Sequence, residues 1–131
     1  MNGETNLQQL LKNMTPILNP GDYVYCTLPN KSTINLADVV CTFREEEGLT
    51  VILKKEIADN HGLPYTYVAA WLTLTVHSSL AATGLTAAFA GALADAGISC
   101  NVVAAYYHDH IFVAKADAEK ALNVLKKLSA Q

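Results

Sequence analysis

The predicted order of secondary structure along this 131-residue sequence indicates an α+β fold of two ferredoxin-like βαββα units that share an antiparallel sheet system. From residue 65 onward, apolar spacing predicts the order β-α-β-β-α, which is the ferredoxin-like order without its last strand. The first half predicts strand, helix, strand and helix, and no Pro/Gly/Ser-rich linker divides the halves. We therefore expect one unit over residues 1–64 and another over residues 65–131. If a strand of the first half fills the missing edge of the second unit, neither half folds alone.

The first half begins with a short amphipathic helix near Thr5–Met14, where leucines recur at helical spacing. Pro16 and the turn signal Pro20-Gly21-Asp22 end that segment. Residues 23–28 then alternate as a strand, with Val24, Cys26 and Leu28 on one face.

A second helix is expected to begin after Asn35, a favourable N-cap, and to end before Gly48. The charge run Glu45-Glu46-Glu47 lies at its end and is interpreted as a solvated face. A short strand over Leu49–Leu53 and a short helix over Lys55–His61 complete this half.

The longest predicted strand runs from Tyr65 to Val76 and has one apolar face. Its other face is amphipathic rather than charged and carries Tyr67, Trp71, Thr73 and Thr75. A face of this kind is more often covered by another sheet or a subunit than left in water.

After that strand, apolar residues from Leu85 keep helical register over three turns, and Gly97 ends the helix. Two strands, Ile98–Tyr107 and Ile111–Ala114, are expected to follow, separated by His108-Asp109-His110. Asp117 then caps a closing helix whose buried stripe is Ala118, Ala121, Leu122, Leu125 and Leu128.

The composition excludes several classes of function. The net charge is −3 with the signs evenly mixed, and no basic stripe is present, so nucleic-acid binding is not expected. No apolar run is long enough to span a bilayer and the N-terminus lacks the features of a signal peptide, so we expect a cytoplasmic protein without membrane contact. The three cysteines, Cys26, Cys41 and Cys100, are widely spaced without a CxxC motif. This spacing predicts reduced, buried thiols and gives no support for zinc.

The segment SSLAATGLTAAFAGALADAGISCNVVAAYYHDHIFV resembles the ACT domain, a small regulatory module that binds amino acids. The resemblance covers residues 65–128 well and extends more weakly over the first half through GDYVYCTLP and FREEEGLTVIL. In particular, the sequence is similar to small bacterial proteins in which such a domain follows an ACT-like N-terminal segment. The resemblance implies a ligand-binding regulatory function without a cofactor.

In the family, effectors bind where the first strand turns into the first helix, usually between two ACT units. The resemblance places this contact zone on His77, Ser78, Ser79, Leu80, Gly84, Leu85 and Thr86. A second zone, at the start of the second strand, corresponds to Ile98, Ser99, Cys100 and Asn101. The family often has Pro before the glycine, whereas this sequence has Thr83.

Physical chemistry independently favours a ligand at the first zone. Unpaired N–H groups at the start of the helix from Leu85 would meet a carboxylate at the favourable end of the helix dipole. Gly84 permits close approach of the backbone, and Ser78 and Ser79 can add hydroxyl hydrogen bonds. Asn101 can accept a hydrogen bond from an ammonium group while donating to a carbonyl.

The cluster His108-Asp109-His110 is the one sequence feature with metal-ligand chemistry. Adjacent residues of a hairpin point to opposite faces, so the preferred interpretation is a turn in which Asp109 accepts backbone N–H bonds. The sequence contains no nucleophile elbow, P-loop, GxGxxG or HExxH motif, and catalysis is not expected.

The resulting hypothesis is a homodimeric sensor whose ligand, an amino acid, bridges ACT units and stabilises one arrangement of them. Its output would go to a protein partner in trans or to the oligomer itself. Two alternatives remain open: a ligand-free assembly module, and a metal-dependent enzyme that uses His77, His108 and His110.

Overall fold

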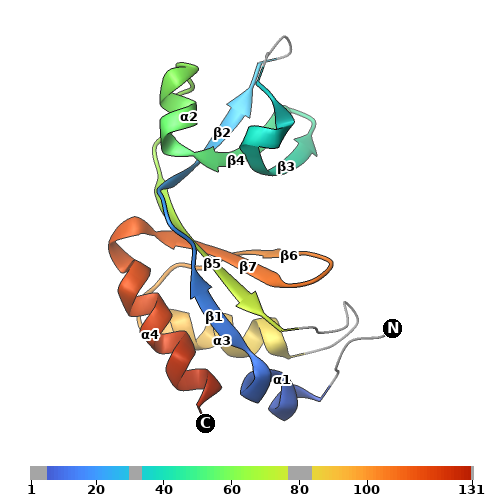
Figure 1. Ribbon diagram of the computed structural model, residues 1–131, viewed down its shortest axis with the longest axis vertical. Coiled ribbons are helices and arrows are strands. Elements are labelled where there is room, and N and C mark those ends of the chain that lie inside the picture. The colour runs from blue at the N-terminus through green and yellow to red at the C-terminus, as the bar shows by residue number, and fades with distance from the viewer. Residues whose placement is uncertain (1–5, 30–33, 77–83, 131) are drawn as a thin grey trace. The chain divides into compact units, whose positions relative to one another are not determined.

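The computed structural model describes residues 6–29, 34–76 and 84–130 (Figure 1). Its helices are α1 (Leu7–Asn13), α2 (Lys55–Asn60), α3 (Leu85–Asp95) and α4 (Ala118–Ser129). Its strands are β1 (Thr15–Leu18), β2 (Tyr23–Leu28), β3 (Val39–Glu45), β4 (Gly48–Lys54), β5 (Val68–Thr75), β6 (Asn101–Ala104) and β7 (Asp109–Ala114). In this described part of the chain, no helix combines the length and apolar character needed to cross a membrane.

Contacts divide the chain into two compact units. Unit 1 consists of Met1–Asn19 and Ala70–Gln131, and unit 2 consists of Pro20–Ala69. The boundary expected between residues 64 and 65 separates two ACT-like units that follow each other in the sequence. The contact units divide the chain by a different criterion, so that expected boundary stays a prediction.

The sheet of unit 1 has the strand order β1-β5-β7-β6. β1 pairs antiparallel with β5 from Thr15↔Thr75 to Leu18↔Leu72, and β6 pairs antiparallel with β7. This order is that of a complete ferredoxin-like sheet. It confirms that a strand from the N-terminal segment fills the missing edge of the C-terminal βαββα unit.

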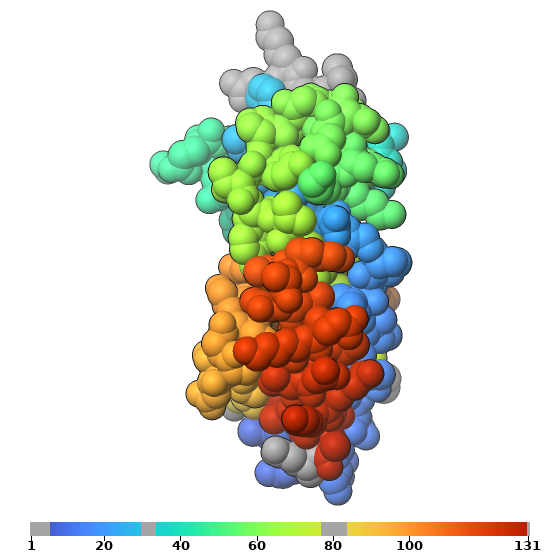
Figure 2. Space-filling view, turned by 90° about the vertical axis from the view of Figure 1, so that its left-hand side faces the viewer, coloured from blue at the N-terminus to red at the C-terminus, as the bar shows by residue number. Residues whose placement is uncertain are grey.

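Three helices cover one face of this sheet. α3 and α4 lie side by side on it (Figures 1 and 2), and α1 packs against both. The predicted apolar face of β5 (Ala70, Leu72, Leu74) is buried beneath them. The helices contribute Leu10 and Met14 beside α1, Phe89 and Leu93 from α3, and Ala121 and Leu125 from α4. Each large apolar side chain buried in this way contributes about 1.5–3 kcal/mol to folding.

Unit 2 is built on a sheet of order β3-β4-β2, to which β5 adds its first residues. Val68 and Ala69 of β5 pair antiparallel with Val24 and Tyr23 of β2. The alternation predicted for β2 is confirmed, since Val24, Cys26 and Leu28 enter a small core with Val51, Leu53 and Ala58. β5 therefore supplies hydrogen-bonding partners in both units.

The helix predicted after Asn35 is wrong. The Asn35 side chain does accept a hydrogen bond from Ala37 N (2.9 Å), but it caps only a 3-10 turn, Leu36–Asp38. The chain then continues as β3, whose β-branched Val39, Val40 and Thr42 favour a strand. The Glu45-Glu46-Glu47 run is solvent-exposed, as predicted, but it lies at the hairpin between β3 and β4 instead of at a helix end.

Candidate functional site

The first expected contact zone lies at the start of α3. Gly84 precedes the helix with φ +94°, a left-handed conformation that favours glycine, and no side chain of the described residues caps the helix. The first intrahelical bond runs from Ala88 N to Gly84 O (2.9 Å), so the N–H groups of Leu85 and Thr86 precede the helical ladder. The Leu85 side chain is buried in the core, whereas Thr86 is exposed. His77, Ser78, Ser79 and Leu80 lie outside the described residues.

The second expected contact zone follows the end of α3. Ile98 is buried and its N–H donates to Leu93 O (2.9 Å), while Ser99 is exposed. Cys100 is half-buried, and burial raises the pKa of its thiol. Asn101 begins β6, and its Nδ2 donates to Phe112 O on the neighbouring strand (3.2 Å). Its Oδ1 remains able to accept a hydrogen bond from a ligand.

These two zones lie at opposite ends of α3. The helix has eleven residues, which at 1.5 Å per residue separate its ends by about 16 Å. A ligand the size of an amino acid is shorter than this distance. The described residues of one chain therefore do not bring Gly84–Thr86 and Ile98–Asn101 into a single site.

The histidine cluster does not form the expected turn. The turn comes earlier, closed by the bond from Ala105 N to His108 O (3.1 Å), and Asp109 is the first residue of β7. Alternation along β7 puts Asp109 and His110 on opposite faces of the sheet, and the Asp109 side chain is only 8% exposed. Burial raises the pKa of Asp109, and the neighbouring His110 and His108 oppose that shift. Among the described residues, no group of three His, Cys, Asp or Glu side chains is placed to hold a metal ion.

A polar network that the sequence did not predict lies on the face of the unit 1 sheet away from the helices. Trp71 Nε1 donates a hydrogen bond to His110 Nδ1 (3.1 Å), and the Thr73 hydroxyl lies 3.2 Å from the same nitrogen. Asn19 Nδ2 donates to Thr73 Oγ1 (2.9 Å) and joins the end of β1 to β5. The indole ring of Trp71 also stacks on Phe112, with ring centroids 6.1 Å apart. Burial lowers the pKa of His110 and the nearby His108 lowers it further, while Asp109 opposes the shift.

Comparisons with known protein families match both halves of the chain. One ACT-domain model matches residues 2–70, and a second ACT-domain model matches residues 67–127. A search of curated proteins gave no match.

The chain is also similar to solved structures. A crystal structure of a protein of unknown function from Vibrio cholerae, described as a possible transport protein, is 49% identical over 94% of this chain and 95% of that chain, with a TM-score of 0.84. A protein from Agrobacterium tumefaciens is 20% identical over 88% of this chain and 89% of that one, with a TM-score of 0.66. The ligand-free regulatory subunit of aspartate kinase from Thermus thermophilus is 12% identical over 86% of this chain and 95% of that one, with a TM-score of 0.60. The last two likenesses show a shared fold.

Proposed function

This chain belongs to the ACT-domain family, with two such domains in tandem, and on that basis we propose that it is a non-enzymatic regulatory protein that binds an amino acid. The observation that carries the proposal is the start of α3. There, Gly84 opens the helix in a left-handed conformation and no described side chain caps the first N–H groups. Such N–H groups and the helix dipole favour a carboxylate.

We propose further that the site forms between two copies of the chain. The two contact zones are about 16 Å apart in one chain, because α3 separates them. In a two-fold dimer with neighbouring α3 helices antiparallel, the start of each helix would approach the end of the other. One ligand would then touch Gly84–Thr86 of one copy and Ile98–Asn101 of its partner, and the dimer would hold two such sites.

Each contact zone has a separate chemical role in this proposal. The ligand carboxylate would accept hydrogen bonds from the N–H groups that open α3, with His77, Ser78, Ser79 and Leu80 completing that side. The ligand ammonium group would donate to Asn101 Oδ1, whose amide nitrogen is already held by Phe112 O. Because the ligand contacts both copies, it would bind the dimer more tightly than the separate chains and shift the population toward the dimer. We place this action in the cytoplasm, which is compatible with the three free thiols.

Thermal unfolding and sedimentation velocity, each with the twenty amino acids in turn, test the proposal. One amino acid should raise the melting temperature and the dimer fraction together. At a hundred times its dissociation constant, it should add about 2.7 kcal/mol to the free energy of unfolding. Asn101→Ala, which removes the proposed acceptor for the ligand ammonium group, should weaken the response. Asn123→Ala, at an exposed position of α4, is the matched control and should leave the response unchanged.

Gly84→Val is unsuitable as the binding variant, because a Cβ at this position would lie 3.3 Å from Leu7 Cδ2 and the backbone is left-handed there. The substitution would disturb folding as well as binding. A folded, dimeric protein that responds to none of the amino acids would contradict the sensor function and favour the ligand-free assembly module.

A further inference from the structure

Unit 2 contains a cavity of about 260 Å³ that has no part in the site proposed above. The turn before β2, the end of β4 and the first turns of α2 form its wall. The residues of this wall are Gly21, Asp22, Lys54, Lys55, Glu56 and Asp59. All of them belong to one unit, so the cavity is complete within a single compact part of the chain.

Apart from Gly21, every residue that lines the cavity has a charged side chain. Two of these residues are lysines and three are acidic. Ligand pockets for drug-sized apolar molecules are larger, about 300–1,000 Å³, and are lined mainly by hydrophobic side chains. The composition of this wall therefore favours a small, charged ligand. The excess of carboxylates over ammonium groups disfavours a ligand with only negative charge.

Backbone and ring contacts fix the shape of the cavity. Lys55 N donates to Asp22 O (2.9 Å), which joins the start of α2 to the turn before β2. On the other side of that turn, the Tyr23 hydroxyl donates to Pro20 O (2.8 Å). Tyr23 and Lys54 are paired residues of β2 and β4, so the sheet register holds both ends of the wall.

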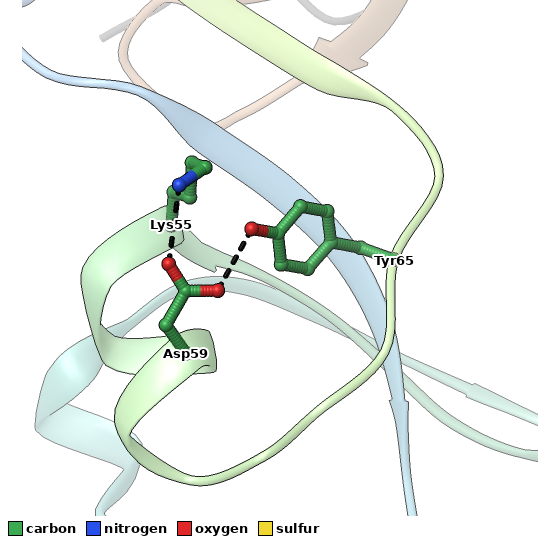
Figure 3. A network of polar contacts seen from close by, with 3 residues as sticks. All are labelled: Lys55, Asp59 and Tyr65. Atoms are coloured by element: carbon green, nitrogen blue, oxygen red, sulfur yellow. Dashed lines mark hydrogen bonds and ion pairs between the residues drawn. The ribbon is translucent and has the colours of Figure 1, made fainter.

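Two of the charged groups are already engaged with each other (Figure 3). Asp59 accepts from the Tyr65 hydroxyl at one oxygen (2.7 Å) and from Lys55 Nζ at the other (3.1 Å). The Tyr65 hydrogen bond, followed by that of Lys55, lowers the pKa of Asp59, so the carboxylate stays ionised. Lys55 Nζ has three hydrogens and gives one to Asp59, so it can still donate toward the cavity.

Lys54 and Glu56, which flank Lys55 in the chain, carry opposite charges and are not engaged in this network. In the described residues, neither side chain makes a hydrogen bond or an ion pair. The cavity thus presents one uncommitted ammonium group and one uncommitted carboxylate. A ligand with a single charge would pair with one of them and leave the other without a partner.

We propose that this cavity binds a small zwitterion, a molecule with an anionic and a cationic group a few bonds apart. The anionic group would accept hydrogen bonds from the ammonium groups of Lys54 and Lys55. The cationic group would lie against the carboxylates of Glu56 and Asp22. This is a second site, independent of the one at the start of α3.

Titration with glycine, followed by NMR of the backbone amides, tests the proposal. Glycine is the smallest zwitterion of this kind, and acetate and methylammonium are its two single-charge halves. The amides of Gly21, Asp22 and Glu56 should shift saturably with glycine, and each half should bind at least about tenfold more weakly, because it lacks one charge-assisted pair. Lys54→Ala and Glu56→Gln should each weaken glycine binding by a similar factor.

The controls separate this site from other effects. Lys120→Ala and Glu119→Gln remove the same charges from exposed positions of α4 and should leave the titration unchanged. Three outcomes would each overturn the proposal. They are that glycine leaves the amides of unit 2 unshifted, that acetate binds as well as glycine, or that Lys54→Ala and Glu56→Gln leave glycine binding unchanged. The amides of Thr86 and Asn101 report the α3 site separately, so either site can fail without affecting the test of the other.

Discussion

At the scale of single residues, the contact between Trp71 and His110 determines which imidazole nitrogen carries the proton. An indole N–H can only donate, so His110 Nδ1 must accept and the neutral ring carries its hydrogen on Nε2. Protonation of Nδ1 would place two donors against each other in a partly buried setting. The fold is therefore complementary to the neutral form of this histidine.

This contact predicts a loss of stability in mild acid. The pKa of His110 is lower in the folded protein than in the unfolded chain, so the unfolded chain binds the extra proton first as the pH falls. The free energy of unfolding should decrease between pH 7.5 and about pH 5.5, across the ordinary histidine pKa of about 6.5. Urea unfolding at several pH values measures this, and His110→Gln should flatten the dependence.

The matched control for that experiment is His61→Gln, because His61 is exposed at the end of α2. Asp109 affects the pH dependence in the opposite direction. Because its pKa is raised in the folded protein, protonation of its carboxyl as the pH falls adds to the free energy of unfolding. An equally steep pH dependence in the His110→Gln variant would contradict the assignment to His110.

A second prediction at the residue scale compares Gly84, which precedes α3, with Gly91 inside α3. Gly84→Ala should destabilise the protein by about 1–2 kcal/mol, because φ is +94° and Leu7 lies 3.3 Å from the new Cβ. Gly91→Ala, inside α3 with open space at its Cβ, should stabilise it by about 0.5–1 kcal/mol. Denaturant unfolding of both variants measures the difference, and a loss of stability in Gly91→Ala would show that α3 packs differently.

At the scale of elements, α1 is a structural part of unit 1. Leu10 is completely buried against the core formed by β5, α3 and α4. Leu10→Ala should therefore cost about 2–5 kcal/mol, the usual range for a large-to-small change in a core. Gln9→Ala, on the exposed side of the same helix, should change the free energy of unfolding by less than about 0.5 kcal/mol. Similar small effects in both variants would contradict the packing of α1.

Apolar periodicity in the sequence predicted correctly those helices and strands in which one face is apolar. α1, α3, α4, β2 and β4 have clear apolar spacing, and their burial followed it. The helix predicted after Asn35 was wrong because the apolar residues there fit a helical spacing. Their β-branched side chains favour a strand, and the structure has β3 in this region. β1 was missed because Pro16 was interpreted as a terminator, whereas an edge strand tolerates proline.

Apolar periodicity could not predict side-chain contacts between residues far apart in the sequence. The Trp71–His110 bond joins residues 39 positions apart, and only the pairing of β5 and β7 brings them together. The separation of the two contact zones, in contrast, follows from the length of α3 alone. The resemblance to the ACT family already implied the residues of both zones and a ligand that bridges ACT units, and the length of α3 adds a physical reason to expect that the ligand bridges two units.

At the scale of the whole molecule, unit 1 depends on residues from both ends of the chain. A fragment of residues 62–131 lacks β1 and α1, so β5 loses an edge partner and the core loses Leu10 and Met14. This fragment should show no cooperative unfolding transition by circular dichroism. Adding a peptide of residues 6–19 in excess should restore one, and a fragment that folds cooperatively without the peptide would contradict the dependence.

The distribution of unit 1 over both ends of the chain has a consequence for biosynthesis. Unit 2 has its whole sequence once Ala69 has left the ribosome, before α3 and α4 of unit 1 have been made. Leu10 and Met14 have been synthesised long before, but their packing partners in α3 and α4 are made after unit 2. During this interval the N-terminal helix exposes apolar side chains that the finished protein buries. A slow or interrupted ribosome would prolong that exposure, and the nascent N-terminal segment would be the part of the chain that chaperones need to protect.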